Sequence, residues 1–178
     1  MTTKVIMAGF GGQGVVLIGT LLAYSGMKEG KHTTFFPSYG AEMRGGTANC
    51  SVIVSDSEIA SPVVNRPDCV VAMNVASLEK FEPVVAPGGA IFVNSSLVEK
   101  RVARKDIAEV RIPANALAEA LGSSRAANMV MLGGLIKKTG AVALGSAVES
   151  LSGVLSERAM ALLDVNKRAL SKGYEEVS

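Results

Sequence analysis

A glycine-rich turn near the amino terminus constrains the fold of this chain more than any other feature. Residues 4–8 have the pattern of a short apolar strand, and residues 15–27 that of a largely apolar helix. Between them, residues 9–14 read Gly-Phe-Gly-Gly-Gln-Gly. Glycine has no Cβ and tolerates positive φ, so this turn can bring backbone N–H groups close to an anion or to tightly packed atoms. A buried strand joined in this way to a helix predicts helices packed on a sheet.

The rest of the chain alternates between strands and helices. Further strands are expected at residues 32–36 (ended by Pro37), 47–55, 59–64, 68–73, 90–94 and 109–112. Helices are expected at 75–84, 115–121, 126–138 and 156–174, with Ser156 as an N-cap, Gly133 and Gly134 allowing a close backbone approach, and residues 140–153 as a link. This alternation predicts one α/β domain over residues 1–178: three α/β/α layers, a mostly parallel sheet and a Rossmann-like start.

Composition and charge exclude several classes of function. The net charge is +2, which is too small to argue for a nucleic-acid partner. No apolar run reaches the ~18–20 residues that a membrane helix needs, and the amino terminus enters the first strand without the pattern of a signal peptide. Cys50 and Cys69 lie in strand-like apolar stretches, which is typical of reduced thiols. We therefore expect a cytoplasmic protein that binds neither nucleic acid nor membrane.

The spacing of the glycine turn fits a dinucleotide-binding motif, but the companion signal is absent. Gly9, Gly11 and Gly14 match G-x-G-x-x-G between a strand and a helix. A nicotinamide or flavin site needs an acidic residue about 20 positions further on, and residues 34–37 contain none. Gln13 also places an amide inside the turn. The residues alone leave three interpretations open: a dinucleotide site, a site for another anion or a partner chain, or glycines that only permit packing.

Few other residues are candidates for chemistry. The chain has no C-x-x-C pair and a single histidine, His32, so metal clusters and His-based nucleophilic catalysis lack their residues. The loop between the second and third strands carries Glu42 and Arg44. Arg44 can bind a carboxylate or phosphate and Glu42 can accept hydrogen bonds from a partner, or the two can pair to hold a surface loop. Asn94 and Asn128 are expected to be caps or buried hydrogen-bond partners.

Three blocks of sequence together resemble a known family. Residues 9–15 read Gly-Phe-Gly-Gly-Gln-Gly-Val, residues 37–52 read Pro-Ser-Tyr-Gly-Ala-Glu-Met-Arg-Gly-Gly-Thr-Ala-Asn-Cys-Ser-Val, and residues 128–133 read Asn-Met-Val-Met-Leu-Gly, with Ser61-Pro62 between the last two. In this order they resemble the gamma subunit of the 2-oxoacid:ferredoxin oxidoreductases. The second block is the most specific and is most similar to the 2-oxoglutarate branch. The pyruvate, branched-chain and indolepyruvate enzymes are the alternatives.

The resemblance implies a function that belongs to an assembly. Enzymes of this family oxidatively decarboxylate a 2-oxoacid on thiamine diphosphate with Mg, pass the electrons through iron–sulfur clusters to ferredoxin, and transfer the acyl group to coenzyme A. The implied partners are alpha and beta subunits, a ferredoxin-like delta subunit, and external ferredoxin reached through the complex. This chain shows neither cluster ligands nor a thiamine signature. We therefore expect it to bind none of these cofactors alone and to be inactive alone.

The resemblance also implies a surface that faces the partner subunits and coenzyme A, with no catalytic residue and no metal ligand in this chain. The residues expected to face coenzyme A or a partner are Gly9, Gly11, Gly12, Gln13, Gly14 and Arg44. The residues expected at the subunit interface are Tyr39, Glu42, Met43, Gly45 and Gly46. One alternative is a free-standing dinucleotide-binding oxidoreductase, which predicts that the isolated chain binds NAD(P) or FAD. Another is a plain interaction module, which predicts assembly without any effect of the loops on turnover.

Overall fold

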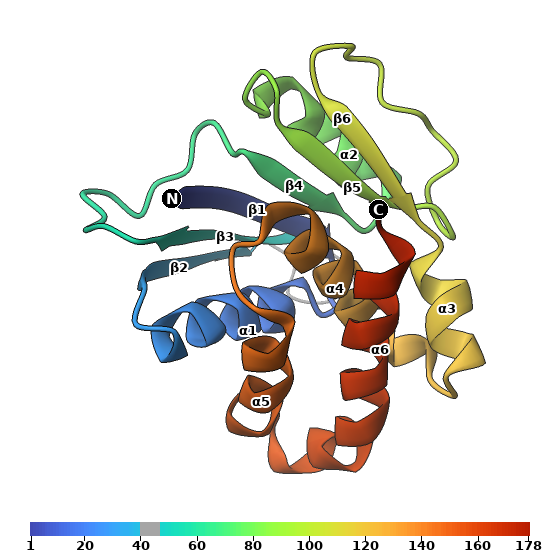
Figure 1. The fold of residues 1–178 in the computed structure, drawn as a ribbon. Coiled ribbons are helices and arrows are strands. Elements are labelled where there is room, and N and C mark those ends of the chain that lie inside the picture. The colour runs from blue at the N-terminus through green and yellow to red at the C-terminus, as the bar shows by residue number, and fades with distance from the viewer. Residues whose placement is uncertain (40–46) are drawn as a thin grey trace.

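The computed structural model describes residues 1–39 and 47–178, and only the backbone of Tyr39. Its centre is a six-stranded sheet with the order β2-β3-β1-β4-β5-β6 (Figure 1). The strands are β1 (Thr2–Phe10), β2 (His32–Tyr39), β3 (Thr47–Ser55), β4 (Cys69–Ala72), β5 (Ala90–Asn94) and β6 (Ala108–Ile112).

Helices cover both faces of this sheet, most of them on one side. The α-helices are α1 (Val15–Lys28), α2 (Val75–Phe81), α3 (Ala114–Ala120), α4 (Ala127–Thr139), α5 (Leu144–Val154) and α6 (Leu163–Glu176). The short 3-10 helices are η1 (Glu82–Val84), η2 (Ser124–Ala126) and η3 (Glu157–Leu162). Figure 1 shows α1, α4, α5 and α6 gathered on one face and α2 on the other.

Two apolar cores follow from this arrangement, one on each face of the sheet. The larger core contains side chains from α1, α4, α5 and α6, including Ile18, Met129 and Leu170. The smaller core joins alternate residues of β1, β4 and β5 to Leu78 of α2 and to Val98 in the segment after β5. Successive strand residues point to opposite faces, so strands with apolar residues on both sides must be covered twice.

The sheet is parallel over most of its width and antiparallel at one side. β1, β4, β5 and β6 are parallel neighbours, whereas β3 runs antiparallel to both β1 and β2. β2 therefore runs in the same direction as β1, with β3 between them. The predicted α/β fold, with a mostly parallel sheet and a strand–turn–helix start, is confirmed.

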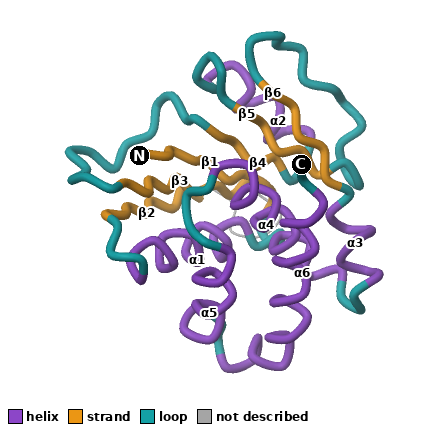
Figure 2. Tube along the Cα trace, in the orientation of Figure 1, coloured by secondary structure: helices purple, strands orange, loops and turns teal. Residues whose placement is uncertain are grey.

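The region from β2 to β4 differs from the sequence prediction in two places. Pro37 does not end β2, which continues to Tyr39 with Pro37 opposite Cys50. β2 is an edge strand, where a residue without an N–H is tolerated. Residues 59–64 form no strand and belong to a connection without regular structure between β3 and β4 (Figure 2).

The carboxyl-terminal third differs in two further places. Residues 140–153, predicted to be a link, contain most of α5, whose Ala147 and Leu151 are fully buried. The predicted final helix is divided into the 3-10 helix η3 and the helix α6. Ser156 does stand at the start of η3, but its carbonyl oxygen rather than its side chain accepts hydrogen bonds, from the amides of Ala159 and Met160.

Glycines on α4 and α6 allow these two helices to touch along their backbones. A Cβ added at Gly133 would lie 2.0 Å from the carbonyl oxygen of Leu170, and one added at Gly173 would lie 1.8 Å from that of Val130. No side chain fits at such distances, so the predicted close approach at Gly133 is confirmed. The contact fixes α4 against α6, and the first residues of α4 contribute to the site described below.

Gly173→Ala tests this helix contact. We expect the free energy of unfolding to fall by about 1–3 kcal/mol or more, because the added methyl group forces α6 away from α4. Urea denaturation measures the change. Gly145→Ala is the matched control: nothing lies within 4 Å of its added Cβ, and alanine in a helix should be neutral or stabilising by up to about 1 kcal/mol. Equal effects of the two substitutions would contradict the close contact.

Candidate functional site

The carboxyl ends of β1 and β4 lie side by side at one edge of the sheet. The glycine turn at residues 9–14 follows β1, and Met73 and Asn74 follow β4. The helices that begin there cover opposite faces, because Ile18 of α1 belongs to the larger core and Leu78 of α2 to the smaller one. Such a change of face between neighbouring parallel strands opens a crevice at their carboxyl ends, where ligands bind in α/β folds.

The side chain of Gln13 closes the crevice between β1 and β4. Its Oε1 accepts hydrogen bonds from the backbone N–H of Phe10 at 2.7 Å and from Nδ2 of Asn74 at 3.1 Å. Its Nε2 donates to the carbonyl oxygen of Met73 at 3.2 Å. A Cβ at Gly9 would lie 2.6 Å from Oε1, so the glycine makes room for the amide. We call this set of contacts the Gln13 clamp, because it ties the turn after β1 to the turn after β4.

A second contact holds the start of α1 against the start of α4. Gly14 is the N-cap of α1 with φ of 71°, and Nδ2 of Asn128 donates to its carbonyl oxygen at 3.1 Å. A Cβ at Gly14 would lie 2.3 Å from Nδ2 of Asn128, so both conformation and packing require glycine. Asn128 is 4% exposed, and the buried Asn94 donates to Asn115 at 2.8 Å. Both are therefore the buried hydrogen-bond partners that the sequence predicts.

This geometry does not favour a dinucleotide site. In a dinucleotide-binding fold, the strand beside the first carries the acidic residue for the ribose. Here the antiparallel β3 occupies that position, and β2 lies two strand spacings from β1, about 10 Å away. The side chains of Gln13 and Asn128 also pack against Gly9 and Gly14, where a pyrophosphate would approach the backbone.

Two adjoining pockets remain open at this edge, and we call them together the carboxyl-edge cleft. Their volumes are about 210 and about 510 Å³, and both are lined by Gly12, Arg125 and Asn128. The smaller pocket extends toward the end of β4, and the larger extends past the start of α1 to Arg158 and Asn166. The cleft combines amide and guanidinium groups, so it can accept a polar or anionic group.

Sequence reasoning did not identify Arg125, Arg158 or Asn166 as site residues. Arg125 follows Ser123 and Ser124 just before α4, and Arg158 lies in a segment that reads as the continuation of a helix. No motif marks either position. These residues come together only in the folded chain, where η2, η3 and α6 line one pocket with the start of α1.

The predicted site residues fall into two groups. The structure places the turn that contains Gly9, Gly11, Gly12, Gln13 and Gly14 at the carboxyl edge. Tyr39 ends β2 opposite Ala48 of β3. The other predicted residues, Glu42, Met43, Arg44, Gly45 and Gly46, lie outside the described residues.

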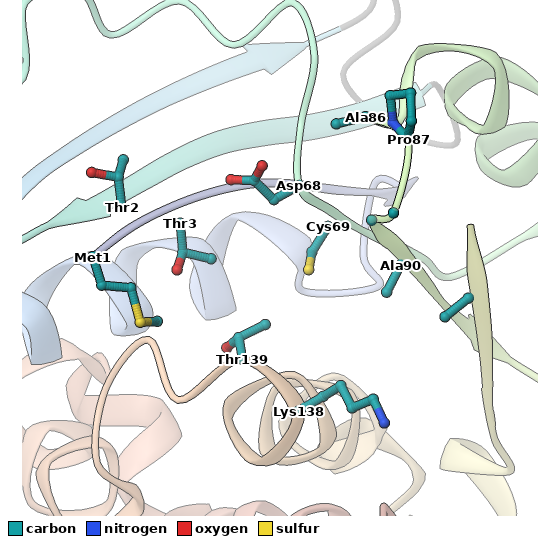
Figure 3. Close-up of a pocket in the computed structure, with 13 residues that line it drawn as sticks. Met1, Thr2, Thr3, Asp68, Cys69, Ala86, Pro87, Ala90, Lys138 and Thr139 are labelled. Atoms are coloured by element: carbon teal, nitrogen blue, oxygen red, sulfur yellow. The ribbon is translucent and has the colours of Figure 1, made fainter. Parts of the chain in front are cut away.

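A separate pocket of about 400 Å³ lies at the opposite edge of the sheet and includes Cys69 and Lys138 (Figure 3). Burial, together with the negative charge of Asp68, raises the pKa of the Cys69 thiol to about 12. Burial likewise raises the pKa of Cys50 to about 12. Nζ of Lys138 is 3.5 Å from the carbonyl oxygen of Ser178. Because the thiolate is the reactive form of cysteine, neither thiol is a nucleophile near neutral pH.

Two further classes of feature are not found in the part of the chain that the structure describes. Over residues 1–39 and 47–178, no three His, Cys, Asp or Glu side chains come together in a way that would hold a metal ion. None of the helices assigned in these ranges is long and apolar enough to cross a bilayer.

Comparison with known proteins places this geometry in a family. Residues 4–176 match the sequence profile of the family described as "Pyruvate ferredoxin/flavodoxin oxidoreductase". The 2-oxoglutarate synthase subunit KorC of Methanocaldococcus jannaschii is 32% identical over 178 residues, with 98% of this chain and 94% of KorC covered. The crystal structure of a keto/oxoacid ferredoxin oxidoreductase gamma subunit from Geobacter sulfurreducens has a TM-score of 0.84 at 27% identity, covering 98% of this chain and 97% of the other.

A relative with higher identity is a much longer protein. The ketoisovalerate oxidoreductase subunit VorA of Methanothermobacter thermautotrophicus is 43% identical over 130 residues, which cover 73% of this chain and 27% of VorA. The chain therefore spans about a quarter of the length of the VorA relatives that it matches.

Asn74→Asp tests the Gln13 clamp. Oδ1 of Asn74 accepts a hydrogen bond from the amide of Ser77 at 2.8 Å as the N-cap of α2, and aspartate can accept the same bond. Aspartate lacks the Nδ2 donor, however, and presents an oxygen to Oε1 of Gln13. We expect the free energy of unfolding, measured by urea denaturation, to fall by about 1–3 kcal/mol.

The control for this test is the same substitution in a Gln13→Ala background. Oε1 of Gln13 is absent in this background. The loss in free energy of unfolding caused by Asn74→Asp should therefore be smaller, by at least about 0.5 kcal/mol, than in the unmodified chain. Equal losses in the two backgrounds would show that the two side chains do not interact, and would contradict the clamp.

Proposed function

The chain belongs to the pyruvate ferredoxin/flavodoxin oxidoreductase family and is of the gamma-subunit type, and we propose that it works in a multi-subunit 2-oxoacid:ferredoxin oxidoreductase acting on 2-oxoglutarate. The assembly would oxidatively decarboxylate the 2-oxoacid, reduce ferredoxin, and form the acyl thioester of coenzyme A. The observation that carries this proposal is the match to the family over residues 4–176.

The assignment to 2-oxoglutarate is supported by the KorC relatives, which are 32–36% identical and are covered to 82–94% of their own length. KorC of Methanocaldococcus jannaschii is covered to 94%, whereas VorA is covered to 27%. The block at residues 37–52, most similar to the 2-oxoglutarate branch, points the same way. A branched-chain 2-oxoacid is the second candidate, because the VorA relative has the higher identity, 43%, over the part that matches.

We propose that this chain contributes a surface rather than catalytic groups. Cys50 and Cys69 are buried with pKa values raised to about 12, and His32, the single histidine, forms no ion pair or side-chain hydrogen bond with any described residue. The amide groups of Gln13 are satisfied within the chain. What is left for function is the carboxyl-edge cleft and the turn beside it.

In this proposal, the carboxyl edge faces alpha and beta subunits, which hold thiamine diphosphate and Mg, and lies on the approach of coenzyme A. A ferredoxin-like delta subunit would carry iron–sulfur clusters and deliver electrons to external ferredoxin. The facing residues are those of the turn (Gly9, Gly11, Gly12, Gln13, Gly14) and those predicted from sequence at Tyr39, Glu42, Met43, Arg44, Gly45 and Gly46. The buried, reduced thiols support a cytoplasmic location.

Reconstitution tests the proposed function. The chain is purified alone and together with its alpha, beta and delta partners, and reduction of ferredoxin is followed with 2-oxoglutarate and coenzyme A. We expect no turnover by the isolated chain and turnover by the assembly, because the part of the chain that the structure describes has no metal-binding cluster and both thiols are buried. Turnover or tight NAD(P) binding by the isolated chain would contradict the proposal.

Two additional arms make this experiment specific. A panel of 2-oxoglutarate, 2-oxoisovalerate, pyruvate and indolepyruvate should show the highest kcat/KM for 2-oxoglutarate, and a preference for 2-oxoisovalerate would identify the branched-chain alternative. In the assembly, the double variant Glu42→Ala, Arg44→Ala should lose activity, since these charges are proposed to face the partners. Full activity of that variant would show that this loop is not part of the proposed surface.

A further inference from the structure

A groove on the surface lies between α6 and the end of α3, and we call it the α6 groove. Figure 1 shows these two helices side by side. The groove has a volume of about 340 Å³ and is lined by Leu121, Lys167, Arg168, Ser171, Lys172 and Glu175. It shares no lining residue with the carboxyl-edge cleft. The α6 groove is therefore a separate feature of the molecule.

Positive charge dominates the lining of the α6 groove. Lys167, Arg168 and Lys172 are cationic, and Glu175 is the one acidic residue among the lining residues. The ion pairs within residues 1–39 and 47–178 involve other basic groups, and none of them includes these three side chains. The groove thus carries charge that the described part of the chain does not neutralise.

The position of α6 keeps these cations together at the surface. Arg168 and Lys172 are four residues apart, so they lie on the same face of the helix, where like charges repel and destabilise it. The helix cannot rotate to separate them from the groove, because Gly173 is in backbone contact with Val130 of α4. A partner that supplies negative charge would relieve this repulsion.

We propose that the α6 groove binds an acidic segment of a partner subunit in the same assembly. Ammonium and guanidinium groups form charge-assisted hydrogen bonds with carboxylates, and Leu121 offers an apolar contact beside them. Complementary charge across an interface speeds association and excludes wrong partners. A partner subunit exists only if the proposed function holds, so the occupant rests on that proposal, whereas the groove itself lies outside the carboxyl edge.

Two other kinds of anionic partner fit the groove less well. The lining has no aromatic side chain on which a base could stack, and the net charge of the chain is only +2, so nucleic acid is disfavoured. An external electron acceptor must dock near a redox centre. This chain has no C-x-x-C pair, and its described residues contain no metal-binding cluster. A lasting contact with a subunit is the better match.

Zero-length cross-linking of the assembled complex tests the occupant. A carbodiimide joins a lysine amine to a carboxylate in direct contact with it, forming an amide while the reagent takes up the water. Mass spectrometry of the digested complex then locates each link. We expect Lys167 or Lys172 to be joined to an Asp or Glu of a partner subunit. Lys105, an exposed lysine beside the Arg104 amide that donates to Glu82 of η1, should not be joined to a partner.

Three outcomes of the cross-linking would overturn the proposal. The first is an assembled complex in which neither groove lysine is joined to a partner subunit. The second is a link only to external ferredoxin, which would identify the groove as a docking site for the acceptor. The third is a link only to a second copy of this chain. The experiment uses the unmodified complex, so it does not depend on how a variant folds.

Charge reversal measures how much the groove contributes to assembly. Arg168→Glu with Lys172→Glu should weaken association with the partner subunits by roughly tenfold or more, because carboxylates then meet carboxylates. Association of the unmodified chain should weaken as salt is added, and that of the variant should respond less. Biolayer interferometry measures the rates, and circular dichroism checks the fold.

Two control variants separate the groove from general charge. Arg66→Glu with Lys105→Glu makes the same change in net charge at exposed positions outside the groove and should leave association unchanged. Arg168→Lys with Lys172→Arg keeps the charge of the groove and should also leave it unchanged. Equal weakening by the two charge-reversed pairs, or none by the groove pair, would overturn the proposal.

The result is distinguishable from that of the proposed function. An assembly that turns over 2-oxoglutarate but shows no link from the groove supports the function and overturns the occupant. An assembly that shows the link but oxidises no 2-oxoacid supports the occupant and contradicts the function. Subunits that do not associate at all would contradict both.

Discussion

The Gln13 clamp is the interaction on which the arrangement of the site depends. The amide of Gln13 joins the turn after β1 to the turn after β4 through Phe10, Met73 and Asn74. The crevice between two parallel strands, which in other α/β folds receives a cofactor, is thereby filled with the chain's own hydrogen bonds. The clamp requires glycine at position 9, because the Cβ of any other residue would collide with the Gln13 side chain.

The hydrogen bonds of the clamp occupy that crevice. The larger pocket of the carboxyl-edge cleft lies to one side of it, at the start of α1. This pocket is lined by Gly14 and Leu17 at the start of α1, and by residues of η2, η3 and α6, which lie much later in the sequence. Of these later elements, α6 is held against α4 by the backbone contacts of Gly133 and Gly173. The cleft that stays open beside the clamp is lined by Arg125 and Arg158.

The sequence allowed the fold to be predicted well, because most of its signals are local. The apolar runs of β1, β4 and β5 and the glycine turn before α1 depend on neighbours in the chain, and the structure confirms them. The prediction that Pro37 ends β2 was wrong, because tolerance of proline depends on β2 being an edge strand, which is a property of the sheet. The prediction of a link at residues 140–153 was wrong because α5 is stabilised by packing on α1 and α6, not by a strong local pattern.

The site could be predicted only in part for the same reason. The turn stands out because glycines recur within six residues, and the family resemblance that it carries is confirmed over residues 4–176. Arg125, Arg158 and Asn166 gave no signal, since what distinguishes them is that they line one pocket in three dimensions. Their positions depend on how α4 and α6 pack together, and no local sequence pattern predicts that packing.

The central claim is that the chain acts through its carboxyl edge in a larger assembly. Hydrogen–deuterium exchange of the chain, alone and in complex with its partner subunits, tests this most directly. The account predicts that amides at residues 9–17 and 123–128 gain protection on assembly, while those at residues 86–90, beside the pocket at the opposite edge, exchange as in the isolated chain. Protection at residues 86–90 with none at the glycine turn would contradict it.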